Sequence, residues 1–286
     1  MENSNTRPIL VTGSHRSGST WVGRMIAKSP EVGYIHEPFN IRYRPGICGA
    51  RFDNWFTYVC DHNTTEYYDH LRKCLEFKYQ FAKQLKSIRT PRNAVRLVED
   101  YSRFSINRIF RVRPLRKDPI AVFSAEWLAR TFAMDVIVLV RHPAAFAGSL
   151  KQANWPHPFQ HFLNQPLLMK NHLSVYADEI EKLSREETDL VDQSILLWNL
   201  IHSTIIKYKK SYPTWHFVRH EDISANPVDE FRKIFLQIKL NYSRSVQREI
   251  QQYSSRDDTG YDKTHSIRRD SKASIWNWKK RLSNEE

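Results

Sequence analysis

A glycine-rich turn near the start of the chain carries residues that could bind a phosphate. Gly13 and Gly18 are separated by four residues, as in a Walker A loop, and Ser19 and Thr20 follow. With a short apolar strand before the turn and a helix after it, backbone N–H groups and a helix dipole would converge on one anion. Ser19 stands where a nucleotide kinase has its lysine, which argues against triphosphate chemistry, and Arg16 supplies a cation instead. The alternative is a serine-rich turn with one exposed arginine.

The clearest strand of the chain ends at a second candidate for phosphate binding. Residues 136–140 read Val-Ile-Val-Leu-Val, which is typical of a parallel strand buried on both faces. Arg141 follows at once, and Pro143 is suited to the first residue of a helix. A guanidinium at a strand tip can bind a phosphate bidentately, and Ser149 in the following helix could add a hydroxyl. Two anion sites at two strand ends indicate a ligand with two separated phosphate groups.

Charged side chains also follow two other expected strands. Glu37 comes after a short strand of residues 32–35 and precedes Pro38, and Lys117 and Asp118 lie at a third strand end. In open α/β sheets the carboxyl ends of the strands line the ligand crevice, where a carboxylate is a candidate general base. Each residue also has a structural alternative, because Glu37 can cap a loop and the other two can form an ordinary charged turn.

These stretches together resemble the sulfotransferases that use PAPS (3′-phosphoadenosine 5′-phosphosulfate). Residues 12–21, Thr-Gly-Ser-His-Arg-Ser-Gly-Ser-Thr-Trp, resemble the 5′-phosphosulfate loop of that family, and residues 138–143 with Ser149 resemble its 3′-phosphate motif. Glu37, followed by Pro-Phe, looks like the catalytic carboxylate of the bacterial and tyrosylprotein branches. Many members carry Lys at the position of Arg16, but Arg also occurs there in the branch with the Glu base. Residues 217–223, 226–227 and 278–282 fit the resemblance as well.

The resemblance implies roles for individual residues. Glu37 would take the proton from an acceptor hydroxyl, and Arg16 would bind the bridging oxygen and the transferred sulfonate. Lys117 or Asp118 would assist on the acceptor side, with Asp118 as the rival candidate for the base. The donor would be bound by Arg16, Ser17, Gly18, Ser19, Thr20, Trp21, Arg141, Ser149, Arg268 and Arg269, the last two from a late basic loop that closes on the 3′-phosphate in this family.

The net positive charge of the chain indicates an anionic partner. Its 286 residues carry a net charge of +13, which nucleic acid, an acidic membrane surface or a multiply charged nucleotide would satisfy. A basic nucleic-acid-binding protein is therefore the alternative from a different functional class. The 31 acidic residues are interspersed with the basic ones, however, and no recognisable nucleic-acid-binding module is present.

Cysteine usage and hydropathy indicate the compartment. Cys48, Cys60 and Cys74 are an odd number without a C-x-x-C pair, so neither a disulfide framework nor a zinc site is indicated, and the account needs no metal. A reducing compartment is the simpler inference. No apolar run is long enough for a signal peptide or a bilayer span. We expect a soluble cytoplasmic protein without a transmembrane segment, for which peripheral membrane contact stays open.

The order of apolar patterns predicts an α/β protein. We expect a P-loop-NTPase-like three-layer fold with a central, mostly parallel sheet, formed by a single sulfotransferase domain over residues 1–286. Within it, residues of about 40–110 would form a mostly helical insertion on the acceptor side. Apolar spacing of three and four residues predicts helices over 64–85, 93–103, 126–132 and 187–208.

Two aromatic segments lie outside these elements. Residues 154–172 combine Trp and Phe with several histidines, and they would either cover the acceptor and stack on a sugar or form a packed surface loop. Trp276 and Trp278 should anchor the basic stretch of residues 262–281. The predicted function is in-line sulfuryl transfer from PAPS to a hydroxyl, on a carbohydrate or glycolipid or, as the alternative, on a small-molecule alcohol.

Overall fold

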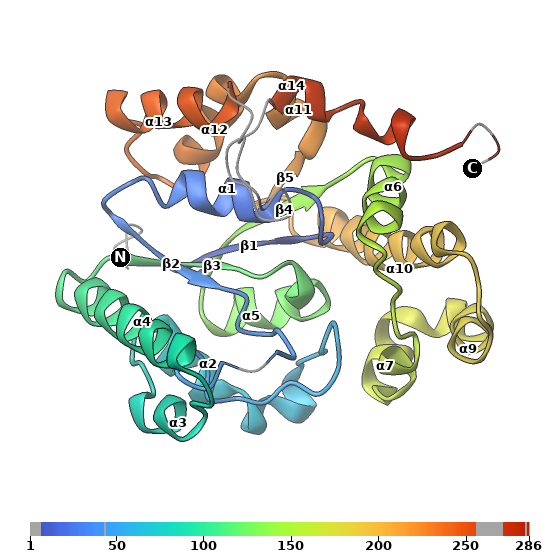
Figure 1. Cartoon of the computed structure of the whole chain (residues 1–286), viewed down its shortest axis with the longest axis horizontal. Coiled ribbons are helices and arrows are strands. Elements are labelled where there is room, and N and C mark those ends of the chain that lie inside the picture. The colour runs from blue at the N-terminus through green and yellow to red at the C-terminus, as the bar shows by residue number, and fades with distance from the viewer. Residues whose placement is uncertain (1–6, 43, 256–270, 284, 286) are drawn as a thin grey trace.

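Five parallel strands form the centre of the computed structural model, which describes residues 7–42, 44–255, 271–283 and 285. The strands follow the spatial order β2-β3-β1-β4-β5 (Figure 1). Their bounds are Ile9–Gly13 for β1, Val32–His36 for β2, Arg113–Lys117 for β3, Asp135–Val140 for β4 and His216–Arg219 for β5. The predicted α/β fold with a parallel central sheet is therefore confirmed.

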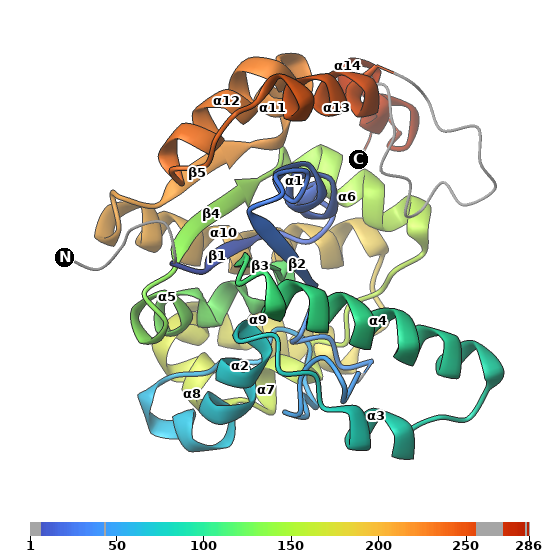
Figure 2. The ribbon, with the colours of Figure 1, turned by 90° about the vertical axis from the view of Figure 1, so that its left-hand side faces the viewer.

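Helices pack against both faces of the sheet because its strands are apolar on both sides. Ile9 and Val11 of β1 join one hydrophobic cluster and Leu10 joins the other, as the alternation of side chains along a strand requires. Figure 2 shows α1, α12 and α13 over one face and α5 and α10 over the other.

The helices of the described residues have the following bounds: α1 (Ser19–Ile26), α2 (Tyr68–Leu75), α3 (Phe81–Lys86), α4 (Pro91–Ile109), α5 (Ala125–Thr131), α6 (Pro143–Ala153), α7 (Gln160–Leu163), α8 (Pro166–Leu168), α9 (Ala177–Arg185), α10 (Leu190–Ser211), α11 (His220–Ala225), α12 (Pro227–Gln237), α13 (Arg244–Ser254) and α14 (Ser271–Ser274). Shorter helical turns lie over 61–66, 119–124, 169–176 and 277–280.

The expectation of one helix over 64–85 is wrong, because the chain breaks it into α2 and α3. Phe77 lies between them with a backbone φ of 51°, a left-handed conformation that ends a helix. Its ring is buried and packs edge-on against Phe104 of α4, with 5.6 Å between the ring centroids. Apolar spacing cannot show this break, because Phe77 is buried by leaving the helix and not by continuing it.

The sheet brings the predicted site residues to one edge. In the parallel register His36 pairs with Lys117, and Gly13 pairs with Leu139. The residues that follow β1, β2, β3 and β4 therefore leave the sheet side by side. Gly13 has a φ of 123°, and a β-carbon built on it would lie 2.1 Å from the Leu139 carbonyl oxygen, so only glycine fits where the loop leaves β1.

Within the described ranges, no helix is both long enough and apolar enough to cross a membrane.

Candidate active site

The turn between β1 and α1 is a tight loop that ends in a helix N-terminus. Gly18 and Arg16 both adopt left-handed backbone conformations, with φ of 84° and 60°. The Ser17 hydroxyl donates to the Ser14 carbonyl, which closes the loop from inside. The first intrahelical hydrogen bond of α1 runs from the Val22 amide to the Gly18 carbonyl, so the preceding amides face the loop without intrahelical acceptors. This is the anion-binding geometry that the glycine spacing predicts.

A cluster of three arginines lies beside the loop. The Nε of Arg16 donates to the Ser149 hydroxyl at 3.0 Å, and Arg141 donates to the Arg16 carbonyl. Burial, and then the charges of Arg16 and Arg281, lower the pKa of Arg141 to about 10. The buried Nε of Arg141 has no hydrogen-bond partner among the described residues. Three close cations with an unsatisfied buried donor are an arrangement that a bound dianion would stabilise, so these residues fit a phosphate-bearing donor.

The carboxylate of Glu37 is held by side chains from two strand ends. Lys117 Nζ forms an ion pair with Oε1, and the Asn40 side-chain amide donates to Oε2 at 3.0 Å. Glu37 itself has a φ of 41°, which turns the chain sharply after β2. Burial favours the neutral carboxyl, but the Lys117 charge, His36 and the two hydrogen bonds outweigh it, and the pKa of Glu37 falls below its usual value. The group is thus an ionised carboxylate at neutral pH.

Replacing Lys117 by methionine should move the acidic limb of the activity profile to higher pH. Without the ammonium, burial dominates and raises the pKa of Glu37, so that the carboxylate becomes protonated at a pH where the wild type is still ionised. The measurement is kcat/KM against pH, with thermal unfolding at each pH as the check on folding. An acidic limb at the same pH in both proteins would show that the pair does not set the ionisation of the active group.

The Asp118 side chain lies in the core, where it pairs with Arg116. Its side chain is fully buried, and Oδ2 accepts from Arg116 Nη2 at 2.9 Å and from the Phe39 amide at 2.9 Å. The Arg116 guanidinium in turn covers the Phe39 ring at 4.4 Å. This ion pair fixes the loop after β2 to β3, which gives Asp118 a structural role.

The other predicted donor-binding residues differ in where their side chains lie. Ser17 and Ser19 are buried within the loop and Thr20 is half-buried at the start of α1. The Trp21 indole is 3% exposed and packs edge-on against Phe231 of α12, so it is part of the core. Arg268 and Arg269 lie outside the described residues.

Arg281 is a site residue that the sequence analysis did not single out. Trp278, three residues earlier, stacks on His142 at 5.5 Å with an interplanar angle of 16°. Gly148 of α6 lets this segment approach closely, since a β-carbon on it would lie 3.3 Å from Cβ of Arg281. Trp278 therefore anchors the C-terminal segment as predicted, whereas the Trp276 side chain is 59% exposed and does not. The sequence offered one indication of Arg281, since it lies within residues 278–282, which fit the family resemblance.

His15 is a second residue that sequence reasoning missed. Its ring packs edge-on against Phe56 at 5.5 Å and Phe146 at 5.0 Å, and its Nδ1 atom is buried without a hydrogen-bond partner in the described part of the chain. Burial, reinforced by Arg16 and opposed by Glu37, lowers its pKa to about 3, so the imidazole is neutral. A neutral imidazole near Arg16 and Glu37 can donate or accept a hydrogen bond without adding charge to the site.

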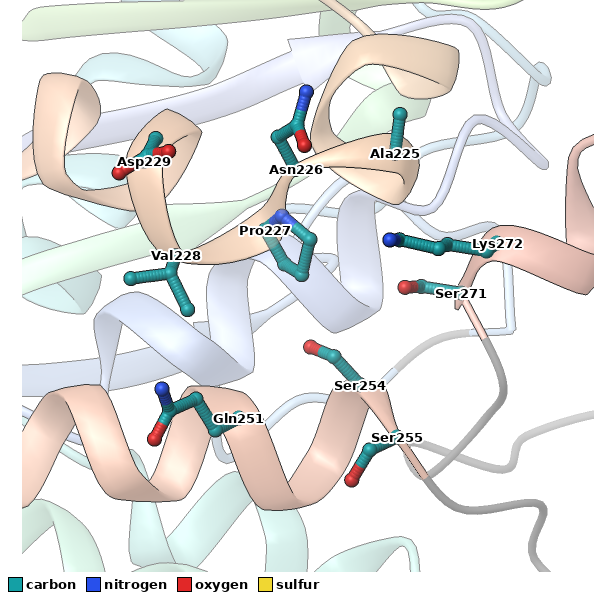
Figure 3. Close-up of a pocket in the computed structure, with 10 residues that line it drawn as sticks. All are labelled: Ala225, Asn226, Pro227, Val228, Asp229, Gln251, Ser254, Ser255, Ser271 and Lys272. Atoms are coloured by element: carbon teal, nitrogen blue, oxygen red, sulfur yellow. The ribbon is translucent and has the colours of Figure 1, made fainter.

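A pocket away from these residues lies between the start of α12, the end of α13 and α14 (Figure 3). Ser254 and Ser271 line it, but their hydroxyls already donate to the Ile250 and Ser224 carbonyls at 2.6 and 2.8 Å. None of the predicted site residues is among its lining residues. Among the described side chains, no group of three or more His, Cys, Asp or Glu residues is arranged to hold a metal.

Comparison with known proteins identifies the family. The family model described as "Sulfotransferase family" matches residues 8–244, and the chain belongs to that family. The sulfotransferase domain from the curacin biosynthetic pathway is similar over 97% of this chain and 92% of its own, with a TM-score of 0.52 and 13% identity. The sulfotransferase domain of the Synechococcus PCC 7002 olefin synthase is similar over 99% of this chain and 91% of its own, with a TM-score of 0.47 and 15% identity. At 13% identity, the likeness to the curacin-pathway domain shows a common fold and nothing further. No curated protein matched the chain.

The protein is therefore a sulfotransferase, the reaction class that the sequence predicts.

Proposed function

We propose that this sulfotransferase moves a sulfuryl group from PAPS to an acceptor hydroxyl on a carbohydrate or glycolipid, with Glu37 as general base. The observation that carries this proposal is the ionised Glu37 carboxylate, fixed by Lys117 and Asn40 at the sheet edge that also holds the anion loop. A base and an anion site at one edge are what transfer from a phosphosulfate to a hydroxyl requires.

The arginine cluster supports a donor with two separated phosphates. Arg16 and the amides at the start of α1 would hold the 5′-phosphosulfate, and Arg141 with Ser149 would hold the 3′-phosphate. Arg281 lies close enough to lower the pKa of both arginines, which adds a third cation to the same region. When bound, PAPS supplies the sulfuryl group and a phosphate leaving group.

The proposed chemistry uses one proton acceptor and one cation. Glu37 accepts the hydroxyl proton while the acceptor oxygen forms its bond to sulfur and the bond between sulfur and the 5′-phosphate oxygen breaks. Arg16 stabilises the negative charge that builds on the leaving phosphate. The products are the sulfated acceptor, PAP and the protonated carboxyl of Glu37. Lys117 keeps Glu37 ionised before the acceptor binds and holds its orientation.

Trp155 supports a carbohydrate acceptor. Its side chain is 44% exposed, and the Arg16 guanidinium carbon lies 5.6 Å from its ring centroid. An exposed indole next to the cation that faces the transferred group offers an apolar platform for a sugar ring. The neighbouring Phe159 and Phe162 are buried in the core, so the segment after α6 is packed at its base and exposed at Trp155.

Transfer of labelled sulfate from PAPS across a panel of glycans, glycolipids and small alcohols tests the acceptor class. We expect Trp155→Ala to raise KM for the preferred sugar acceptor roughly 10-fold, since an aromatic platform contributes on the order of 1 kcal/mol or more. Trp276→Ala, which removes a similarly exposed indole, is the control and should leave KM unchanged. Preference for small alcohols with no effect of Trp155→Ala would replace the carbohydrate assignment by the small-molecule one.

A further inference from the structure

The outer side of α4 carries an apolar stripe that no other described element covers. Val95, Val98, Ile106 and Ile109 are 57%, 60%, 53% and 75% exposed. Their spacing of three, eight and three residues places them on one face of the helix. Figure 2 shows α4 lying across the outside of the molecule.

This stripe is separate from the face by which α4 packs on the protein. The buried residues of α4 are Leu97, Asp100 and Phe104, which fall on the opposite side of a helical projection. Asp100 forms ion pairs with Arg44 and Arg103, which fix that inner face. The helix is thus held by one side while the other presents large aliphatic groups to solvent. Isolated exposed apolar residues are ordinary, but four large aliphatic side chains on one helix face, with the exposed Ser102 between them, indicate an interaction surface.

The apolar surface continues onto α3. Phe81 of α3 packs edge-on against Tyr101 of α4 at 5.3 Å, and both side chains are more than two-fifths exposed. Leu85 lies one turn after Phe81 and is 54% exposed. The surface therefore spans two adjoining helices, and α3 lies beside the amino-terminal half of α4 in Figure 2.

Positive charge surrounds this surface. Residues 81–111 hold eight Lys or Arg residues against two acids, a net charge of +6 within the +13 of the whole chain. Since Asp100 is buried in its ion pairs, Glu99 is the one exposed acid of this segment. The exposed cations that flank the two helices are Lys83, Lys86, Arg89, Arg92, Arg96, Arg108 and Arg111.

This charge decides between two occupants of the apolar face. A second copy of the chain seated on the same face would bring two basic segments together with only Glu99 on each side to compensate, and like charges in contact are destabilising. An anionic bilayer surface attracts each of these cations, and the aliphatic side chains of the stripe can insert at the level of the lipid headgroups. Apolar residues on one face with Lys and Arg on its flanks are the pattern of a helix lying in a membrane interface.

We infer that the α3–α4 face, Phe81 to Arg111, docks this enzyme on an anionic lipid surface. The interaction is peripheral: α4 lies parallel to the bilayer and its exposed aliphatic side chains enter the headgroup region. Docking of this kind would bring the enzyme to acceptors that are themselves held in a membrane, such as the glycolipid of the proposed function. The docking surface itself involves none of the residues of the candidate active site.

The test is co-sedimentation of the full chain with vesicles, without donor or acceptor. Wild-type protein should bind vesicles in which phosphatidylglycerol is about a third of the lipid at least ~10-fold more tightly than pure phosphatidylcholine vesicles, and binding should weaken with added salt. The double variant Val98→Glu, Ile109→Glu should lose a further ~10-fold or more in affinity for the anionic vesicles.

The matched control is the double variant Val175→Glu, Leu236→Glu. It adds the same two negative charges at positions that are 86% and 79% exposed but lie outside α3 and α4, and it should bind nearly as tightly as wild type. Equal losses in both variants, or equal binding of wild type to neutral and anionic vesicles, would overturn the inference. A dimer in analytical ultracentrifugation that only Val98→Glu, Ile109→Glu dissociates would assign the face to a second copy.

The outcome is independent of the proposed sulfuryl transfer. Vesicle binding is measured without turnover, and the stripe variant should sulfate a water-soluble acceptor at the wild-type rate. Loss of vesicle binding with unchanged turnover therefore concerns docking alone, whereas absence of turnover with intact vesicle binding concerns the proposed function alone. Thermal unfolding should be unchanged in both double variants, since all four side chains are exposed.

Discussion

Replacing Glu37 by glutamine should lower kcat roughly 10²- to 10⁴-fold, the usual contribution of a positioned general base. Glutamine keeps the length of the side chain and can still accept from Asn40, but it cannot accept the proton of an acceptor hydroxyl. Affinity for PAP should be little changed, because the nucleotide is held by the loop and the arginines. The measurement combines single-turnover sulfuryl transfer with calorimetric titration of PAP.

Asp118→Asn is the matched comparison for this prediction. Because Asp118 is fully buried against Arg116, the amide should lower the melting temperature and leave kcat per folded molecule close to that of wild type. Undiminished turnover in Glu37→Gln together with loss of turnover in Asp118→Asn would make Asp118 the base and contradict the assignment made from the site geometry.

Replacing Arg141 by alanine should weaken PAP binding roughly 10- to 100-fold, as expected for loss of a charge-assisted hydrogen bond to phosphate. The wild type should prefer PAP over adenosine 5′-phosphate, and the variant should lose most of that preference, because Arg141 would contact the phosphate that distinguishes the two nucleotides. Titration calorimetry with both nucleotides measures this directly.

Arg130→Ala removes the same charge from the exposed surface of α5, where the guanidinium pairs with Asp61 at 2.7 Å. It controls for the general effect of a lower net charge and should leave both affinities unchanged. If Arg141→Ala kept the wild-type preference for the 3′-phosphate, that phosphate would bind elsewhere, and the third cation of the cluster, Arg281, would be the first candidate.

The site could be predicted from the sequence where its chemistry depends on strand ends. Residues 136–140 are apolar throughout and four of the five are β-branched, which favours a buried strand with Arg141 at its tip. The same reasoning brings Glu37 and Lys117 together, because neighbouring parallel strands leave the sheet at one edge. Gly13 also indicates the position of the loop, because no residue with a β-carbon would fit at this point of the chain.

The parts that could not be predicted depend on contacts between distant segments. Alternation along the strand separates Lys117 from Arg116 and Asp118, but it does not show that Asp118 pairs with Arg116 while Lys117 pairs with Glu37. The helical spacing after Ser19 indicates a buried side for Trp21, but only the packing of α12 shows that its indole meets Phe231. Arg281 comes near Arg16 although the two are 265 residues apart in the chain, and the stacking of Trp278 on His142 holds its segment there.

The most direct test of the account is the thermal stability of the wild-type protein with different nucleotides. The account predicts that PAP raises the melting temperature, by an amount that corresponds to about 2.7 kcal/mol at 100 times its Kd, and that ATP with Mg²⁺ or duplex DNA does not. Stabilisation by ATP with Mg²⁺ or by DNA, with none by PAP, would contradict the use of PAPS as the donor and the roles assigned to Arg16 and Arg141.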